Sequence, residues 1–164
     1  MTIAFAGDAI PPYQSGSIYL YQPDQVLRTR LGGNADRLAE YLNALNVTAL
    51  AVLSAARPEL PTSGAIVVAV KPGKRSRVWL SISDGGISKD LRVTLIDRLE
   101  SIEPMDVYVG PVAVALSFHA WGGAMSRSDK DSVVPIPEEW KNAAKATGGG
   151  TLPDSALNFL WPGP

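Results

Sequence analysis

The sequence has no cysteine and only one histidine, His119, among its 164 residues. A chain without cysteine cannot form disulfides, thiol nucleophiles or thiolate metal ligands. A zinc site needs three or more His, Cys or carboxylate ligands, so a chain with one histidine is not expected to bind zinc. We therefore expect neither a metal nor a cofactor.

An excess of charge of one sign is also lacking, because 15 Lys and Arg residues balance 16 Asp and Glu residues. Such a chain has no long-range field that would attract polyanions, and nucleic acid is not an expected partner. The densest basic cluster, residues 71–77, is interpreted as a solvated hairpin turn. No apolar run approaches the roughly 18 residues of a membrane span, so membrane insertion is not expected.

The composition is that of an ordinary globular protein, with 46% hydrophobic and 19% charged residues. A chain of this length can bury a sizeable core without disulfides or metals. We expect one domain over residues 1–164, made of an N-terminal arm (1–33), a core (34–121) and a tail (122–164).

The N-terminal third predicts a strand and a helix. Residues 18–21 are a short strand-like run within the arm. Apolar residues recur at helical spacing between residues 35 and 46, which predicts a helix there. The next stretch, residues 47–53, is apolar on all sides and is compatible with a continued helix or with a buried strand.

The middle of the chain predicts a β-hairpin, a helix and a third strand. A β-branched run at residues 64–70 and alternating residues at 77–83 flank turn residues, as in a hairpin. An amphipathic helix is expected at residues 88–102, with Leu95 at the centre of its apolar stripe and charged residues, Arg92 and Glu100 among them, on its solvent-facing side. Residues 107–119 form the third strand, and the doubly apolar first strand is expected between the other two.

These elements predict an α+β fold of two layers. The expected sheet is rich in antiparallel pairs and has a ββαβ core, with an additional N-terminal helix and a loop-rich C-terminal tail that contains a short helix near residues 137–146. Helix 88–102 should cover one face of the sheet. The helix at 35–46 is the expected cover of the other face, and the apolar end of the tail is expected to dock on its own domain.

The order of parts between residues 60 and 121 resembles the C-terminal domain of TonB, a periplasmic energy-transducing protein of Gram-negative envelopes. The resemblance lies in Gly64 opening a strand, the Lys71-Pro72-Gly73-Lys74 turn, the Ser83-Asp84-Gly85 break, and the helix leading through Gly110-Pro111-Val112 to Phe118. It implies a ββαβ layer and a bacterial envelope setting, in the periplasm. Ile102-Glu103-Pro104-Met105 replaces the family's Trp-x-Phe-x-Pro signature. Energy transduction is not expected, because no membrane anchor or Pro-rich segment is found before the domain in this sequence.

The expected function is non-enzymatic binding of another protein, as an adaptor or interaction domain. An exposed strand edge can accept an extended peptide, and the third strand is expected to lie near an edge. The N-terminal arm, through residues 18–21, could instead occupy this edge within the monomer and close it. The partner-binding residues expected on this basis are Ala113, Ala115, Ser117, His119 and Trp79. Two alternatives stay open: a small hydrolase centred on His119, with Ser117 and Asp106 nearby, and a structural protein that forms a homodimer through its sheet.

Overall fold

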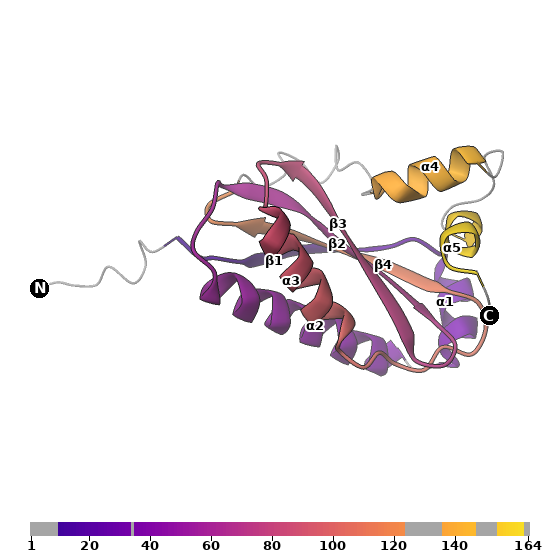
Figure 1. Ribbon diagram of the computed structural model, residues 1–164. Coiled ribbons are helices and arrows are strands. Elements are labelled where there is room, and N and C mark those ends of the chain that lie inside the picture. The colour runs from indigo at the N-terminus through magenta and orange to yellow at the C-terminus, as the bar shows by residue number, and fades with distance from the viewer. Residues whose placement is uncertain (1–9, 34, 124–135, 147–153, 163–164) are drawn as a thin grey trace, which may run out of the picture.

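The computed structural model describes residues 10–33, 35–123, 136–146 and 154–162 (Figure 1). The elements, in chain order, are β1 (Gln14–Leu20), α1 (Asp24–Leu31), α2 (Ala35–Ala55), β2 (Thr62–Lys71), β3 (Arg75–Asp84), α3 (Lys89–Glu100), β4 (Val112–Ala120), α4 (Glu138–Ala146) and α5 (Asp154–Leu160). The architecture is α+β, with one antiparallel sheet and helices packed on it, as the sequence predicts.

The sheet has the strand order β1-β4-β2-β3, and every pair is antiparallel. β2 lies between β3 and β4, as its apolar run predicts, and residues 65–70 are buried on both faces. The β2–β3 turn includes Gly73 and Lys74, both with positive φ, which a glycine adopts at no steric cost. The predicted order of these three strands, with β2 between β3 and β4, is therefore confirmed.

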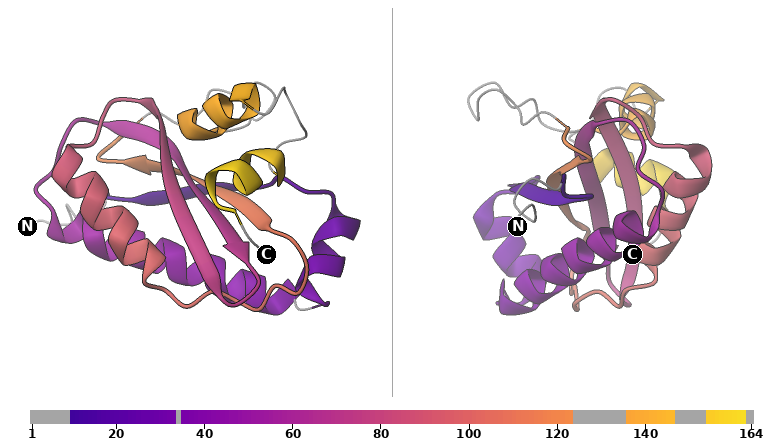
Figure 2. Two further views of the ribbon diagram at one scale, coloured as in Figure 1. Left: turned by 45° about the vertical axis from the view of Figure 1, so that its right-hand side comes forward. Right: turned by 90° about the vertical axis from the view of Figure 1, so that its left-hand side faces the viewer.

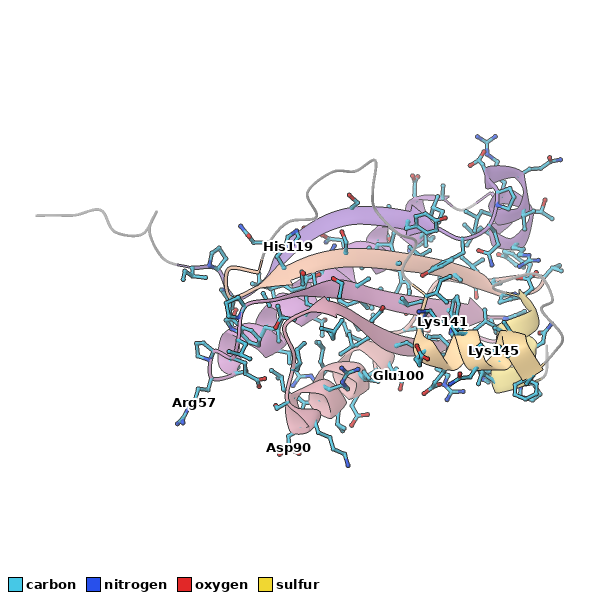
Figure 3. The ribbon with its side chains drawn as sticks, turned by 90° about the horizontal axis from the view of Figure 1, so that it is seen from above. Arg57, Asp90, Glu100, His119, Lys141 and Lys145 are labelled. Atoms are coloured by element: carbon cyan, nitrogen blue, oxygen red, sulfur yellow. The ribbon has the colours of Figure 1, made fainter. Side chains whose placement is uncertain are left out.

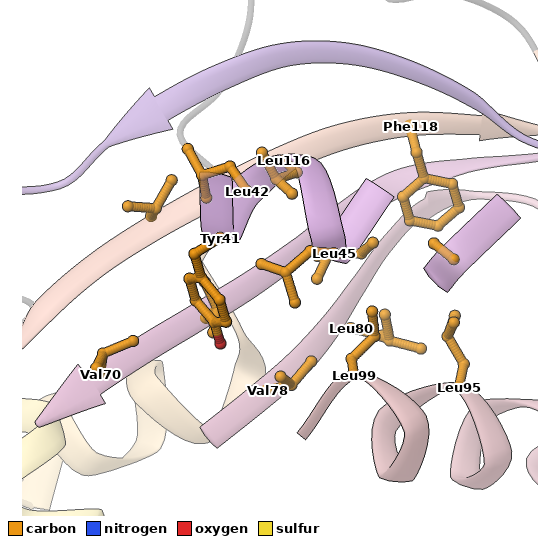
Figure 4. Packing of buried hydrophobic residues seen from close by; sticks show 14 of the residues in the cluster. Tyr41, Leu42, Leu45, Val70, Val78, Leu80, Leu95, Leu99, Leu116 and Phe118 are labelled. Atoms are coloured by element: carbon orange, nitrogen blue, oxygen red, sulfur yellow. The ribbon is translucent and has the colours of Figure 1, made fainter. Parts of the chain in front are cut away.

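The first face of the sheet carries large aliphatic and aromatic side chains and is covered by α2 and α3. Leu95 and Leu99 of α3 are fully buried there, and the Ser88 side chain caps the helix by accepting from the N–H of Leu91. Figure 4 shows Leu45 of α2 packed between the sheet and α3. The stretch at 47–53 continues α2 as a helix.

The helix that begins at residue 35 was expected on the opposite face from α3, and this expectation is wrong. Both helices contribute to one hydrophobic cluster with Val78, Leu80 and Phe118. The physical reason is side-chain size, because the broad apolar stripe of α2 packs against a face of large residues. Helix α2 also has the length and mean hydropathy, 1.3, of a membrane-spanning helix, criteria that a core helix satisfies equally.

The second face of the sheet carries small residues and is covered by α4 and α5. Trp140 of α4 and Leu157 of α5 have no exposed surface and lie against Ala65, Ala113 and Ala115. Figure 2 shows α4 on the far side of the sheet from α2. The helix predicted near residues 137–146 is thus present as α4, and the apolar tail docks on its own domain.

The described part of the N-terminal arm, residues 10–33, contains a longer strand than the sequence indicated and also a helix. β1 runs along β4, and α1 follows it with Leu27 and Leu31 buried. Gly32 ends α1 in the left-handed conformation, a common helix terminator. Because β1 pairs with β4, the third strand has no open edge, and the alternative in which residues of the arm close that edge is the one observed. The outermost strands are β1 and β3.

Candidate functional site

The five residues expected to bind a partner lie on the second face of β3 and β4. Ala113 and Ala115 are buried beneath the helices, and the backbone N–H of Ser17 in β1 donates to Ser117 Oγ at 2.6 Å. β4 is paired on both sides, by β1 and by β2, so its backbone offers no open ladder. Trp79 is the one member of this set on an outermost strand.

His119 is buried, and its Nδ1 atom has no hydrogen-bond partner within the described residues. Asp106 lines a cavity of about 530 Å³ with Lys74 and Glu103, to which His119 does not contribute. Ser117 is bonded to the backbone of Ser17 rather than to the imidazole. The described residues therefore do not form a hydrogen-bonded triad around His119, and the hydrolase alternative gains no supporting contact.

A second cavity, of about 390 Å³, follows the outer edge of β3. Its floor is the strand itself, residues 77–80. One wall is the helix α3, through Arg92, Ile96 and Glu100. The other is Pro137 with the first two residues of α4, Glu138 and Glu139. Figure 3 shows Glu100 beside β3, between α3 and α4. We call this cavity the β3 groove.

Two backbone groups of β3 that point into the β3 groove are bonded by side chains of α3. The N–H of Val78 donates to Glu100 Oε2 at 2.9 Å, and the carbonyl of Leu80 accepts from Arg92 Nη1 at 3.4 Å. In an antiparallel sheet, alternate residues of an outer strand direct their backbone groups away from the neighbouring strand. A carboxylate and a guanidinium therefore occupy positions where the carbonyl and the N–H of a further strand would lie.

The α4 side of the β3 groove is aromatic and charged. The indole Nε1 of Trp79 donates to Glu139 Oε2 at 3.0 Å, which ties the start of α4 to the strand. The guanidinium of Arg77 lies 5.5 Å from the centre of the Trp79 ring and donates to the carbonyl of Leu160 at 3.2 Å. On the α3 side, the apolar Ile96 lies between the charged Arg92 and Glu100, so both walls combine apolar and charged groups.

The hairpin end beside the groove is closed by the C-terminal segment. Lys71 is 1% exposed, donates to the carbonyl of Trp161 and lies 5.0 Å from the centre of the Trp161 ring. Burial lowers the pKa of Lys71, and the charge of Arg75 lowers it further. The interpretation of residues 71–77 as a solvated turn is thus wrong for Lys71, because the tail covers it.

Sequence reasoning missed Arg92 and Glu100 by treating them as solvent-facing charges. Their signal is the four-residue spacing of Arg92, Ile96 and Glu100, which places them in one row along α3 beside the buried Leu95 and Leu99. Only the packing of α3 against the sheet shows that this row follows the edge of β3.

No group of three or more His, Asp or Glu residues that could hold a metal ion occurs in the described part of the chain. Comparisons with protein-family models, with curated proteins and with solved structures find no match to this chain.

Proposed function

We propose that this chain is a non-enzymatic protein-binding domain that captures an extended segment of a partner by adding it as a strand to β3. The observation that carries the proposal is that Glu100 and Arg92 already satisfy the outward backbone groups of Val78 and Leu80 inside a walled groove. Strand addition supplies backbone bonds for affinity and alternating side-chain sites for specificity. The resemblance to the TonB C-terminal domain would place this adaptor in the bacterial periplasm.

Strand addition would replace each hydrogen bond between a side chain and β3 by a hydrogen bond between backbones. An incoming carbonyl would replace the Glu100 carboxylate at Val78, and an incoming N–H would replace the Arg92 guanidinium at Leu80. Both side chains are partly exposed, so they return to water without a large desolvation change. Net affinity must then come from further ladder bonds, at Ser76 and Ile82, and from apolar side chains placed against Ile96.

The test starts from peptides selected on the purified domain from a random heptapeptide library. In the complex, the amides of Val78 and Leu80 should be protected from hydrogen exchange, because they become part of a ladder. Glu100→Ala should tighten peptide binding about five-fold, which corresponds to the loss of a competing hydrogen bond of about 1 kcal/mol. Asp97→Ala, an exposed carboxylate on the same helix, is the matched control and should leave the affinity unchanged.

A second variant tests the strand directly. Ile82→Pro removes one outward N–H of β3, a change that an outer strand tolerates, and should weaken binding of the same peptides. Selected peptides that bind Ile82→Pro as tightly as the wild type, without protecting the Val78 amide, would show that the β3 groove is not the binding site.

A further inference from the structure

Among the described residues, no further strand pairs with the outer edge of β1, which is the second edge of the sheet. Figure 3 shows β1 as the outermost strand on the side away from α3, and all seven of its residues are exposed. The N–H of Tyr21 donates to the carbonyl of Ala113, so by alternation Tyr19 directs its backbone toward β4. Ile18 and Leu20 then direct their N–H and carbonyl groups outward, away from the sheet.

This edge lacks the features that usually prevent two sheets from pairing. Outer strands are normally protected by charged residues, proline or bulges. Residues 13–22 contain no charged residue, and the irregularity in the β1–β4 pairing lies between Ser15 and Ile18, which leaves residues 18–20 regular. The opposite edge differs, because charged groups of Glu100 and Arg92 occupy its backbone positions.

The exposed side chains of β1 are apolar and match one another in an antiparallel arrangement. Ile18, Tyr19 and Leu20 are 56%, 40% and 43% exposed. A two-fold axis at Tyr19 pairs Ile18 with the partner's Leu20 on the first face, and Tyr19 with the partner's Tyr19 on the second. Axes at Ile18 or Leu20 would instead bring Gly16 or Gln22 into the pairing and bury less apolar surface.

Tyr19 also ends an aromatic row that crosses the second face. Its ring lies 5.2 Å from that of Tyr21, which lies 5.2 Å from Trp140, and Trp140 lies 5.3 Å from Trp79. Directly opposed aromatic side chains stabilise antiparallel strand pairs. The two Tyr19 residues would face each other without mutual backbone hydrogen bonds, and the side chains of such pairs lie closer together than those of hydrogen-bonded pairs. A second copy would therefore extend this row across the axis.

We propose that two copies of this chain pair antiparallel through β1, about a two-fold axis at Tyr19, and join their four-stranded sheets into one continuous sheet. The occupant is a second copy because an uncharged, apolar strand is complementary to itself, and a symmetric contact uses the same surface on both subunits. The contact covers one strand and its flanks, so the dimer is expected to be weak and concentration-dependent.

Sedimentation velocity from about 1 μM to about 1 mM tests the dimer. The wild type should shift from monomer to dimer over this range. Tyr19→Lys and Tyr19→Glu should each stay monomeric, since each places like charges directly opposite one another at the axis. An equal mixture of the two variants should regain the dimer, because opposite charges then meet.

The controls separate this edge from the rest of the surface. Val93→Lys and Val93→Glu place the same charges on an exposed position of α3 and should leave the wild-type dimer intact. Ile18→Pro removes an outward N–H and should also give a monomer. This second variant keeps the proposal testable if the Tyr19 variants do not fold. A wild type that stays monomeric at 1 mM, or a dimer that survives in the Tyr19 variants, would overturn the proposal. Peptide binding at β3 should be unchanged in the Tyr19, Ile18 and Val93 variants. The proposed dimer and the proposed peptide binding can therefore be disproved independently of each other.

Discussion

At the scale of single residues, the size of side chains on the two faces of the sheet decides what covers each face. The second face presents Ala65, Ala69 and Ala113, which leave room for the whole indole of Trp140. The first face presents larger residues such as Leu116 and Phe118 and receives two helices. On the second face, small strand residues pack against one large indole. On the first face, large strand residues pack against the aliphatic side chains of α2 and α3. Both arrangements give the close packing that is typical of protein interiors.

Leu95 is the residue at which the core of the first face is most easily tested. Its side chain has no exposed surface between α3 and the sheet. Leu95→Ala should lower the free energy of unfolding by about 2–5 kcal/mol, the range for removing a buried leucine side chain. Val93→Ala, 49% exposed on the same helix, should change it by less than about 0.5 kcal/mol in the same urea titration. Equal effects of the two substitutions would show that α3 does not pack as described.

At the scale of elements, the C-terminal helices are held to the N-terminal arm by a small polar cluster. Arg30 of α1 donates to Asp154 of α5 through two nitrogens, at 3.1 and 2.7 Å. Gln22 donates to Asp154 and to the carbonyl of Pro111. Burial raises the pKa of Asp154, but the hydrogen bond and charge of Arg30, with Gln22, hold it below its usual range.

Asp154→Asn should therefore loosen α5. We expect a loss of about 0.5–1.5 kcal/mol at pH 7, modest because solvent reaches part of the ion pair. The folded pKa is depressed, so this contribution is present above the unfolded pKa and is lost as the pH falls through the folded value. The difference between wild type and variant in urea unfolding should shrink below pH 4.

The matched control is Asp24→Asn, which removes a carboxylate from an exposed pair with Arg28 within α1. It should change the free energy of unfolding by less than about 0.5 kcal/mol at pH 7. A loss in Asp154→Asn no larger than in this control, or one that persists unchanged at pH 3, would contradict the role given to the cluster.

At the scale of the whole molecule, two buried tyrosines, Tyr13 and Tyr41, and the partly buried Tyr21 respond to alkaline pH in the same direction. Burial raises the pKa of Tyr13 and of Tyr21, and burial with the nearby charge of Glu100 raises that of Tyr41 to about 12. Tyr13 stacks on Phe118 and donates to Asn46, Tyr21 packs on Trp140, and Tyr41 lies in the core of the first face. Both faces of the sheet therefore depend on neutral phenols.

The stability of the protein should fall above about pH 10. The unfolded chain loses these phenolic protons near the ordinary tyrosine pKa of about 10, whereas the folded chain retains them to higher pH. A raised folded pKa contributes stability that is complete below the unfolded pKa and is lost as the pH rises through the folded one. Urea unfolding at pH 8 and pH 11 measures the loss, which should be smaller in Tyr41→Phe and unchanged in the exposed Tyr108→Phe. An equal loss of unfolding free energy between pH 8 and pH 11 in both variants would be evidence against burial of Tyr41.

Local pattern determined much of this protein by sequence alone. Alternation and β-branching predicted β2, β3 and the last strand, and the apolar spacing around Leu95 predicted α3. The turn at Gly73 and the helix near residues 137–146 also followed, because each depends on residues close together in the chain. The position of β2 between β3 and β4 followed for another reason: its run is apolar on both faces, which is typical of an inner strand. Helix α1 was missed, although Pro23 and Gly32 mark its ends.

The tertiary structure alone decided which surfaces are open. Pairing of β1 with β4, over a separation of about a hundred residues, closed the edge expected at Ala113 and Ala115. Packing of α3 turned Arg92 and Glu100 from solvent-facing charges into partners of β3, and only Trp79 of the expected residues stayed at an outermost strand. Hydrophobic periodicity specifies which side of an element is buried, but not against which distant element it packs, and so sequence predicted the elements better than the site.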